Sequence, residues 1–178
     1  MAVEPSAWIT RFGPAVASGG AVLDVACGGG RHTRWFAARG HPVTAVDRDL
    51  CGMADLVDDE RIELVAHDLE DGSPWPLPDR TFAAVVVTNY LWRPILADVV
   101  RSVGPGGWLL YETFAAGNER FGRPTNPEFL LRPGELLEAV HGGFRVVAYE
   151  DVIVDQPRPA AVQRMAATRD HGRGEHHS

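Results

Sequence analysis

Short hydrophobic runs alternate along this chain with stretches in which apolar residues recur every three or four positions. The short runs are rich in β-branched residues and are bounded by glycine, proline or polar clusters, which favours strands, whereas the longer spacing favours helices. Strands are expected at 21–25, 42–47, 62–66, 82–88, 108–114, 144–154 and 160–168. Helices are expected at 6–17, 32–39, 51–57, 94–103 and 133–141.

The order of these elements predicts the class of fold. The first five strands mostly alternate with helices, which is typical of parallel βαβ units. The run FAAVVVT at 82–88 is the most apolar, so we expect it in the middle of the sheet, covered on both faces. The last two strands follow each other directly. The sequence therefore predicts one α/β domain over 1–169, a doubly wound, mostly parallel seven-stranded Rossmann-like sheet with an antiparallel terminal strand pair.

Some stretches break these periods. The tetrapeptide Gly-Pro-Gly-Gly at 104–107 is expected to end the fourth helix before the fifth strand. Pro133 is expected in the first turn of the last helix, where proline is tolerated. The stretch 115–131 is polar and irregular, and 170–178 is expected to be a disordered, histidine-containing tail.

Composition and charge narrow the classes of function. The 178 residues are 45% hydrophobic and carry a formal net charge of −7. The basic residues are scattered, so a nucleic-acid partner is disfavoured. No run has the length of a membrane span, and the first residues, MAVEPSAW, lack the features of a signal peptide, so we expect a cytoplasmic protein without membrane contact. The two cysteines define no disulfide framework.

The stretch 21–33, AVLDVACGGGRHT, reads as a strand, a tight glycine turn and the start of a helix. Small residues allow the sharp turn and let a ligand approach the backbone, while the unpaired amides of the helix start can hold electronegative atoms. A dinucleotide fingerprint G-x-G-x-x-G/A fails at Thr33, and a P-loop would need a lysine before a serine or threonine. The turn therefore predicts a different ligand.

The pattern Asp24-x-Ala26-x-Gly28-x-Gly30 resembles the first motif of class I S-adenosylmethionine (SAM)-dependent methyltransferases, usually D/E-x-G-x-G-x-G, with alanine for the first glycine. The similarity covers roughly 21–168 and is to small types such as the tellurite-resistance and other small-molecule enzymes. It implies that this loop holds the methionine end of SAM. The cofactor-binding residues implied here are Asp24, Ala26, Cys27, Gly28, Gly30 and His32, although packing is an alternative role for Cys27.

Further candidates follow the next strands. Asp47 ends the second strand 17 residues after Gly30, and an acid at about this spacing binds ribose hydroxyls; Arg48 stands beside it. The resemblance implies that Asp68 accepts a hydrogen bond from the adenine amino group and that Leu69 packs on the ring. The alternative is that these acids only occupy solvated turns.

The fourth strand ends at Asn89 and Tyr90, where the resemblance implies groups near the transferring methyl. The D/N-P-P-Y/F/W motif of DNA-amino methyltransferases is missing, and Tyr90 could face the substrate or merely pack. The stretch 115–131 is predicted to be a substrate lid in which Asn118, Arg120 and Arg123 contact the acceptor, the alternative being a surface loop. No catalytic base and no metal spacing can be named.

These observations predict a SAM-dependent methyltransferase that acts on an unidentified, small-molecule acceptor. Two alternatives stay open, a protein or RNA methyltransferase and a SAM-binding module without catalysis. A nicotinamide-dependent oxidoreductase is disfavoured by Thr33 and Asp24. The oligomeric state is left open.

Overall fold

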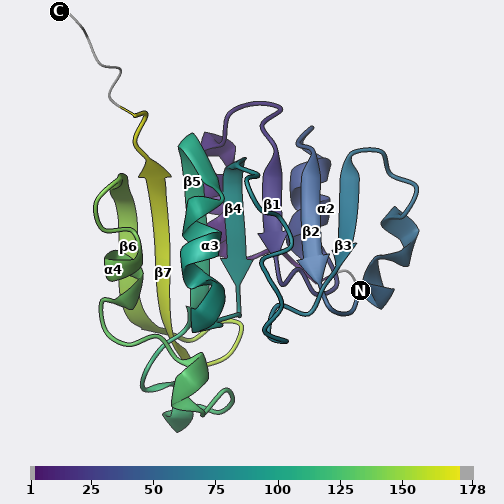
Figure 1. The fold of residues 1–178 in the computed structure, drawn as a ribbon. Coiled ribbons are helices and arrows are strands. Elements are labelled where there is room, and N and C mark those ends of the chain that lie inside the picture. Colours follow the sequence, from purple (N-terminus) through teal and green to yellow (C-terminus); the bar gives the residue numbers. More distant parts are fainter. Residues whose placement is uncertain (1–2, 173–178) are drawn as a thin grey trace, which may run out of the picture.

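A computed structural model describes residues 3–172, which form a seven-stranded sheet (Figure 1). The strand order is β3-β2-β1-β4-β5-β7-β6. The strands are β1 (Val22–Val25), β2 (Val43–Asp47), β3 (Ile62–Ala66), β4 (Phe82–Thr88), β5 (Val103–Phe114), β6 (Phe144–Val154) and β7 (Ala160–Arg169). The first five are parallel to one another, and β7 is antiparallel to both β5 and β6. The predicted fold class is confirmed.

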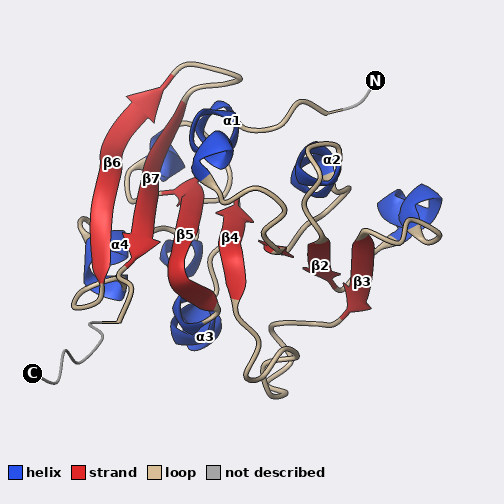
Figure 2. Ribbon diagram, turned by 90° about the horizontal axis from the view of Figure 1, so that it is seen from above, coloured by secondary structure: helices blue, strands red, loops and turns tan. Residues whose placement is uncertain are grey.

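Helices cover both faces of the sheet (Figure 2). They are α1 (Ala7–Phe12), α2 (Arg31–Ala37), α3 (Leu96–Arg101) and α4 (Glu135–Ala139). Figure 2 shows α1 and α2 on one face and α3 and α4 on the other. Each face has its own apolar core: Trp8, Ile9 and Phe36 pack on the first, and Val99 and Leu136 on the second. Burial on both faces explains why β4 is apolar along almost its whole length.

The prediction that residues 104–107 separate the fourth helix from the fifth strand is wrong. Strand β5 already begins at Val103, which is buried and pairs with Phe82, and the register then shifts so that Ala84 faces Trp108. The glycine-rich residues form an irregularity inside the ladder, where a Cβ on Gly107 would lie 2.8 Å from the Phe82 carbonyl oxygen. Helix α3 accordingly ends at Arg101, and a 3-10 turn at Arg93–Ile95 precedes it.

Other boundaries shift by a few residues. Helix α1 gives way to a 3-10 turn at Gly13–Ala15, and the expected helix at 51–57 is a 3-10 segment, Cys51–Leu56. Helix α4 begins after Gly134, whose left-handed backbone (φ 74°) caps it, so Pro133 lies outside its first turn. Most of the expected tail, 173–178, lies outside the described residues.

The irregular stretch after β5 is closed at its base by a bridge between Ala115 and Leu131. Short 3-10 turns at Asn118–Arg120 and Pro127–Phe129 lie within it. We call residues 115–131 the β5 loop. No helix within residues 3–172 is long and apolar enough to cross a membrane.

Candidate cofactor and acceptor site

The loop after β1 has the left-handed backbone that its small residues predict. Ala26, Gly28 and Gly30 all have positive φ, of 52°, 55° and 82°. A Cβ at Gly28 or Gly29 would meet nothing within 4 Å, so this backbone faces open space. Gly30 has a different role, because a Cβ there would lie 2.6 Å from the Met53 side chain. The loop therefore offers its backbone to a ligand at Gly28 and Gly29, while Gly30 allows close packing.

Asp24 connects the strand before this loop to the helix after it. It is buried in β1, and its carboxylate accepts a 2.7 Å hydrogen bond from the Thr33 hydroxyl in α2. Burial raises the pKa of Asp24 to about 6, although the bond from Thr33 opposes this. Asp24 thus joins β1 to α2 and lines none of the pockets described below.

Asp47 ties the end of β2 to the same loop. One of its carboxylate oxygens accepts a 2.8 Å hydrogen bond from the Gly28 amide, and the other accepts one of 3.0 Å from the Asp49 amide. Each oxygen has two lone pairs, so both can accept a further hydrogen bond from a ligand.

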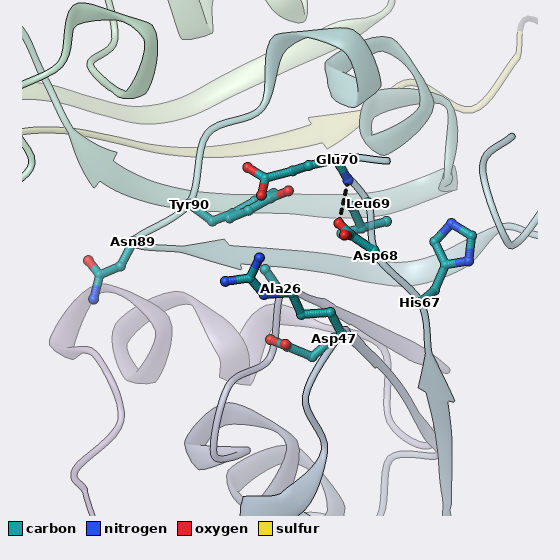
Figure 3. A pocket seen from close by; sticks show the side chains of 9 residues that line it. Ala26, Asp47, His67, Asp68, Leu69, Glu70, Asn89 and Tyr90 are labelled. Atoms are coloured by element: carbon teal, nitrogen blue, oxygen red, sulfur yellow. Dashed lines mark hydrogen bonds between the residues drawn. The ribbon is translucent and has the colours of Figure 1, made fainter. Parts of the chain in front are cut away.

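A pocket of about 250 Å³ lies where β1 to β4 end (Figure 3), and we call it the strand-end pocket. Asp68 is held in place because its carboxylate accepts a 2.9 Å hydrogen bond from the Glu70 amide. The lining residues come from four strand ends: Ala26, Asp47, Arg48, His67, Asp68, Leu69, Glu70, Asn89 and Tyr90.

A second pocket opens over the glycine turn, and we call it the glycine-loop pocket. Its lining includes Gly28, Gly29 and two arginines. Arg34 forms an ion pair with Asp55, whereas Arg31 donates one 3.1 Å hydrogen bond to the Glu4 carbonyl. The buried thiol of Cys27 also lines this pocket; burial raises its pKa, so it stays protonated and is not a nucleophile.

A third pocket, of about 290 Å³, lies between the β4 end and the β5 loop, and we call it the aromatic pocket. Pro124 and Phe129 of the β5 loop form one wall. The full lining is Glu70, Asn89, Tyr90, Leu91, Thr113, Phe114, Pro124 and Phe129.

Asn89 lines all three of these pockets. It directly follows β4, has a left-handed backbone (φ 53°), and donates its amide to the Glu112 carbonyl at 2.9 Å. Asparagine tolerates this conformation better than most residues. Left-handed backbone at both Ala26 and Asn89 turns the chain sharply at two neighbouring strand ends, which opens the space between them.

Tyr90 borders the strand-end and aromatic pockets. Its carbonyl accepts a 2.8 Å hydrogen bond from the buried Tyr111 hydroxyl, which fixes the chain after β4. Burial, and then the nearby carboxylates of Glu70, Asp68 and Asp47, raise the pKa of the Tyr90 phenol far above its usual value. The phenol therefore stays protonated and is not a base.

A methyltransferase domain family matches residues 22–107, which include the glycine turn and β1 to β4. This match covers just under half of the chain, so residues 22–107 are similar to a methyltransferase domain. The malonyl-[acyl-carrier protein] O-methyltransferase of Serratia marcescens is 38% identical over 104 residues, covering 54% of this chain but only 39% of that relative. The chain therefore matches about two fifths of the length of this curated relative.

Solved structures of methyltransferases share the fold of this chain. TehB from Haemophilus influenzae superposes with a TM-score of 0.70 at 17% identity, over 92% of this chain and 61% of TehB. The 1,6-didemethyltoxoflavin-N1-methyltransferase of Burkholderia thailandensis, solved with its acceptor and S-adenosylhomocysteine (SAH), gives 0.68 at 21% identity, over 92% and 76%. The predicted resemblance to class I SAM-dependent methyltransferases is confirmed.

Most of the predicted cofactor residues line these pockets, but Asp24, Gly30 and His32 do not. His32 is buried, and its Nε2 accepts a 3.0 Å hydrogen bond from the Ser6 amide, so its proton belongs on Nδ1, 3.4 Å from the Thr88 hydroxyl. Burial lowers the pKa of His32 to about 4. His32 thus joins the start of the chain to α2 as a neutral side chain.

The predicted acceptor residues of the β5 loop lie outside the lining of the aromatic pocket. Asn118 is buried, donating to the Pro124 carbonyl at 3.0 Å and accepting from the Ala161 amide at 3.2 Å, so its role is to fasten the loop to β7. Arg120 donates to the Gly117 carbonyl and lies over Phe121. The lid and the contacts of Arg120 and Arg123 with an acceptor remain predictions.

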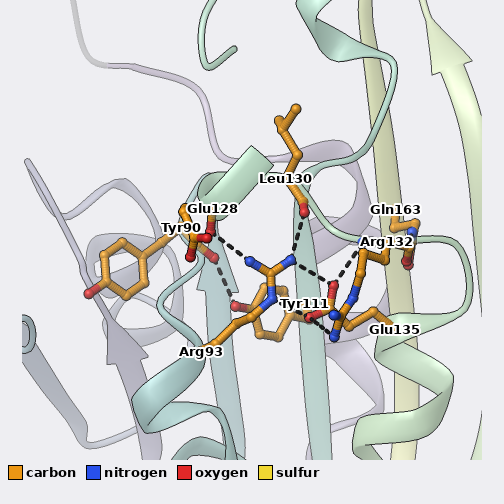
Figure 4. A network of polar contacts seen from close by, with 8 residues as sticks. All are labelled: Tyr90, Arg93, Tyr111, Glu128, Leu130, Arg132, Glu135 and Gln163. Carbon is orange, nitrogen blue, oxygen red and sulfur yellow. Dashed lines mark hydrogen bonds and ion pairs between the residues drawn. The ribbon is translucent and has the colours of Figure 1, made fainter. Parts of the chain in front are cut away.

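A polar network around Arg93 holds the β5 loop against the methyltransferase domain (Figure 4). Its guanidinium donates to the carbonyls of Glu128 and Leu130, at 2.9 and 2.8 Å, and pairs with the Glu135 carboxylate at 2.6 Å. Although burial alone would raise the pKa of Glu135, the Arg93 guanidinium and the Arg132 amide hold it below its usual value. These bonds flank Phe129 and so fix one wall of the aromatic pocket.

Sequence reasoning missed Glu70, His67, Arg31, Pro124 and Phe129 as lining residues. The first two flank Asp68 and Leu69, so their position next to a predicted adenine site was an available signal. Arg31 opens the helix after the glycine turn. For Pro124 and Phe129 no periodic signal exists, because the irregular loop that carries them is placed by tertiary contacts.

Proposed function

We propose that this chain binds SAM and transfers its methyl group to a small-molecule acceptor. The meeting of three pockets at Asn89 carries the proposal. A cofactor with an adenosyl part and an amino-acid part needs two adjoining spaces, and the acceptor needs a third that opens on their junction.

The strand-end pocket fits the adenosyl part. Asp47 would accept hydrogen bonds from the ribose hydroxyls with the lone pairs that the Gly28 and Asp49 amides leave available. Asp68 would accept from the adenine amino group, and Leu69 would pack on the ring. These residues all line one pocket, as this role requires.

The glycine-loop pocket fits the amino-acid part. The open backbone at Gly28 and Gly29 has no side chain in the way. Arg31 uses one donor on the Glu4 carbonyl, and a guanidinium has five, so others can hold a carboxylate. The chemistry of the donors in both pockets therefore matches the two halves of SAM.

SAM, when bound, supplies a methyl group already activated by a sulfonium. The protein's own contribution is then to hold the acceptor in line and to exclude water, and orientation of this kind can lower a barrier by roughly 7–11 kcal/mol. Asn89 and Tyr90 lie where the acceptor and cofactor spaces join. A general base is needed only for an acceptor that arrives protonated.

The names of two similar proteins bear on the class of acceptor. The Burkholderia protein is named for a small heterocyclic acceptor, whereas the Serratia protein is named for an acyl-carrier-protein acceptor. The volume of the aromatic pocket, about 290 Å³, suits a small molecule. A protein or RNA acceptor and a SAM-binding module without catalysis are the alternatives.

Labelled SAM distinguishes these alternatives. The purified chain is incubated with panels of small amines, thiols and hydroxy compounds, with acyl-carrier protein and with tRNA, beside an Asp47→Ala variant as the negative control. Asp47-dependent label in a small molecule supports the proposal. Label only in protein or RNA, or SAH binding with no transfer to any panel, would overturn the small-molecule enzyme.

A further inference from the structure

Four of the eight residues that line the aromatic pocket are apolar, and the other four are Glu70, Asn89, Tyr90 and Thr113. Leu91, Phe114, Pro124 and Phe129 supply carbon surface, and Phe129 keeps 38% of its surface exposed. An exposed aromatic ring at the wall of a pocket favours a ligand that covers it. Arg93 fixes one wall of this pocket, and the volume of about 290 Å³ leaves room for a ring-sized ligand.

The lining of the aromatic pocket includes an acidic residue and no basic residue. Glu70 and Tyr90 are the ionisable residues of its lining, and the Tyr90 phenol is neutral. Within residues 3–172 no arginine or histidine pairs with the Glu70 carboxylate. Arg93, the arginine nearest along the chain to the β4 end, is occupied by Glu135 and two carbonyls. An anionic acceptor would therefore lose part of its hydration here and gain no cation from the lining of this pocket.

Glu70 also lines the strand-end pocket, together with Asn89 and Tyr90. Figure 3 shows Glu70 on the same side of that pocket as Tyr90. Its carboxylate therefore belongs to the boundary between the acceptor space and the cofactor space. A negative group at this boundary stabilises positive charge that appears on an acceptor atom during the reaction.

We infer that the aromatic pocket selects an uncharged ring compound with an amine as its nucleophile, and that Glu70 is the residue that sets this preference. The inference rests on the proposed methyl transfer. The amine nitrogen lone pair forms the new N–CH₃ bond while the S–CH₃ bond breaks and its electron pair stays on sulfur. The nitrogen becomes positive and then releases its N–H proton to the Glu70 carboxylate, from which it passes to water.

The test uses compounds that share one two-ring framework, namely an aminoquinoline, a hydroxyquinoline and a quinoline carboxylate. Calorimetry first measures SAH binding, and the three compounds are then titrated into the SAH complex. The aminoquinoline should bind at least about tenfold more tightly than the carboxylate, because its N–H groups can donate hydrogen bonds to the Glu70 carboxylate, which repels a second carboxylate. Transfer of labelled methyl should follow the same order.

Variants assign the preference to Glu70. Glu70→Gln should remove most of the amine-over-carboxylate ratio, whereas Glu128→Gln, which removes the same charge from a loop residue outside the pocket lining, should retain it. Phe129→Ala should weaken all three compounds alike and leave SAH binding unchanged. Absence of SAH binding would count against the proposed function itself. With SAH bound, a carboxylate that binds as well as the amine, no binding of any of the three, or a ratio that survives Glu70→Gln would overturn this inference.

Discussion

The Gly28 amide donates a 2.8 Å hydrogen bond to the Asp47 carboxylate. This bond joins the turn after β1 to the end of β2, and therefore joins the glycine-loop pocket to the strand-end pocket. Asp47 has two roles as a consequence. It shapes the loop before any ligand arrives, and it offers its remaining lone pairs to the ligand.

Asp47→Ala should weaken SAH binding by at least about tenfold, because hydrogen bonds to a charged acceptor contribute roughly 1.5–3 kcal/mol. The fold should persist, since Asp47 is the last residue of β2 and is only half-buried. Titration calorimetry measures the affinity. Asp49→Ala is the matched control: it removes an equal charge two residues away, outside the pocket lining, and should change the affinity little. Equal affinities of Asp47→Ala and the unmodified protein would place the ribose elsewhere.

Ala26→Gly should raise the free energy of unfolding by up to about 1 kcal/mol. Alanine in the left-handed region costs roughly 1–2 kcal/mol, which exceeds the extra chain entropy of glycine, about 0.5–1 kcal/mol. Ala38→Gly is the control, and it should lower the free energy of unfolding. Ala38 has a φ of −62°, so glycine there relieves no strain and only adds chain entropy to the unfolded state. Urea unfolding of both variants tests the pair; destabilisation by both would show that Ala26 is not strained.

Asp24→Asn should change how stability depends on pH. The pKa of Asp24 rises from 3.8 to about 6 on folding, so its stabilising contribution is complete below pH 3.8 and is lost as pH rises through 6. Asparagine can still accept from Thr33 but does not titrate. The free energy of unfolding of Asp24→Asn, relative to that of the unmodified protein, should therefore rise between pH 3.8 and pH 6 by up to about 3 kcal/mol. Above this range the difference should stay level.

Urea unfolding from pH 4 to pH 8 measures this difference. His32, with its pKa lowered to about 4, contributes the opposite slope, losing stability as pH falls below 6.5. It is present in both proteins, so its contribution cancels in the comparison. A difference that does not vary with pH would contradict the raised pKa of Asp24.

Arg93→Ala should destabilise the protein by about 3 kcal/mol, because it leaves the Glu135 carboxylate, whose side chain is only 6% exposed, without its partner. Arg80→Ala breaks an ion pair with Glu63 whose side chains are 43% and 53% exposed, so it should cost less than about 1 kcal/mol. Thermal or urea unfolding compares them. Similar losses in both variants would show that Arg93 does not fasten the β5 loop.

The fold was predictable because local patterns and topology agree. Strands β3, β4 and β6 begin and end where the sequence predicts, since each is an apolar or β-branched run between clear breaks. The start of β5 was not predictable from the sequence. Val103 joins the ladder by pairing with Phe82, and this contact, distant in sequence, overrides the local signal of three glycines and a proline.

Part of the candidate site was also predictable from the sequence, and part was not. Asp47, Asp68 and Asn89 could be placed because the ends of neighbouring parallel strands meet at one edge of a sheet. The buried roles of His32 and Asn118 depend on partners far along the chain, Ser6 and Ala161, that no local pattern reveals.

Calorimetry of the unmodified protein with SAH tests the cofactor site most directly, with NADH titrated in parallel under the same conditions. The pockets that meet at Asn89 predict one SAH bound per chain with a dissociation constant in the micromolar range, and no heat of binding from NADH. Binding of NADH without any binding of SAH would contradict the assignment of these pockets to SAM.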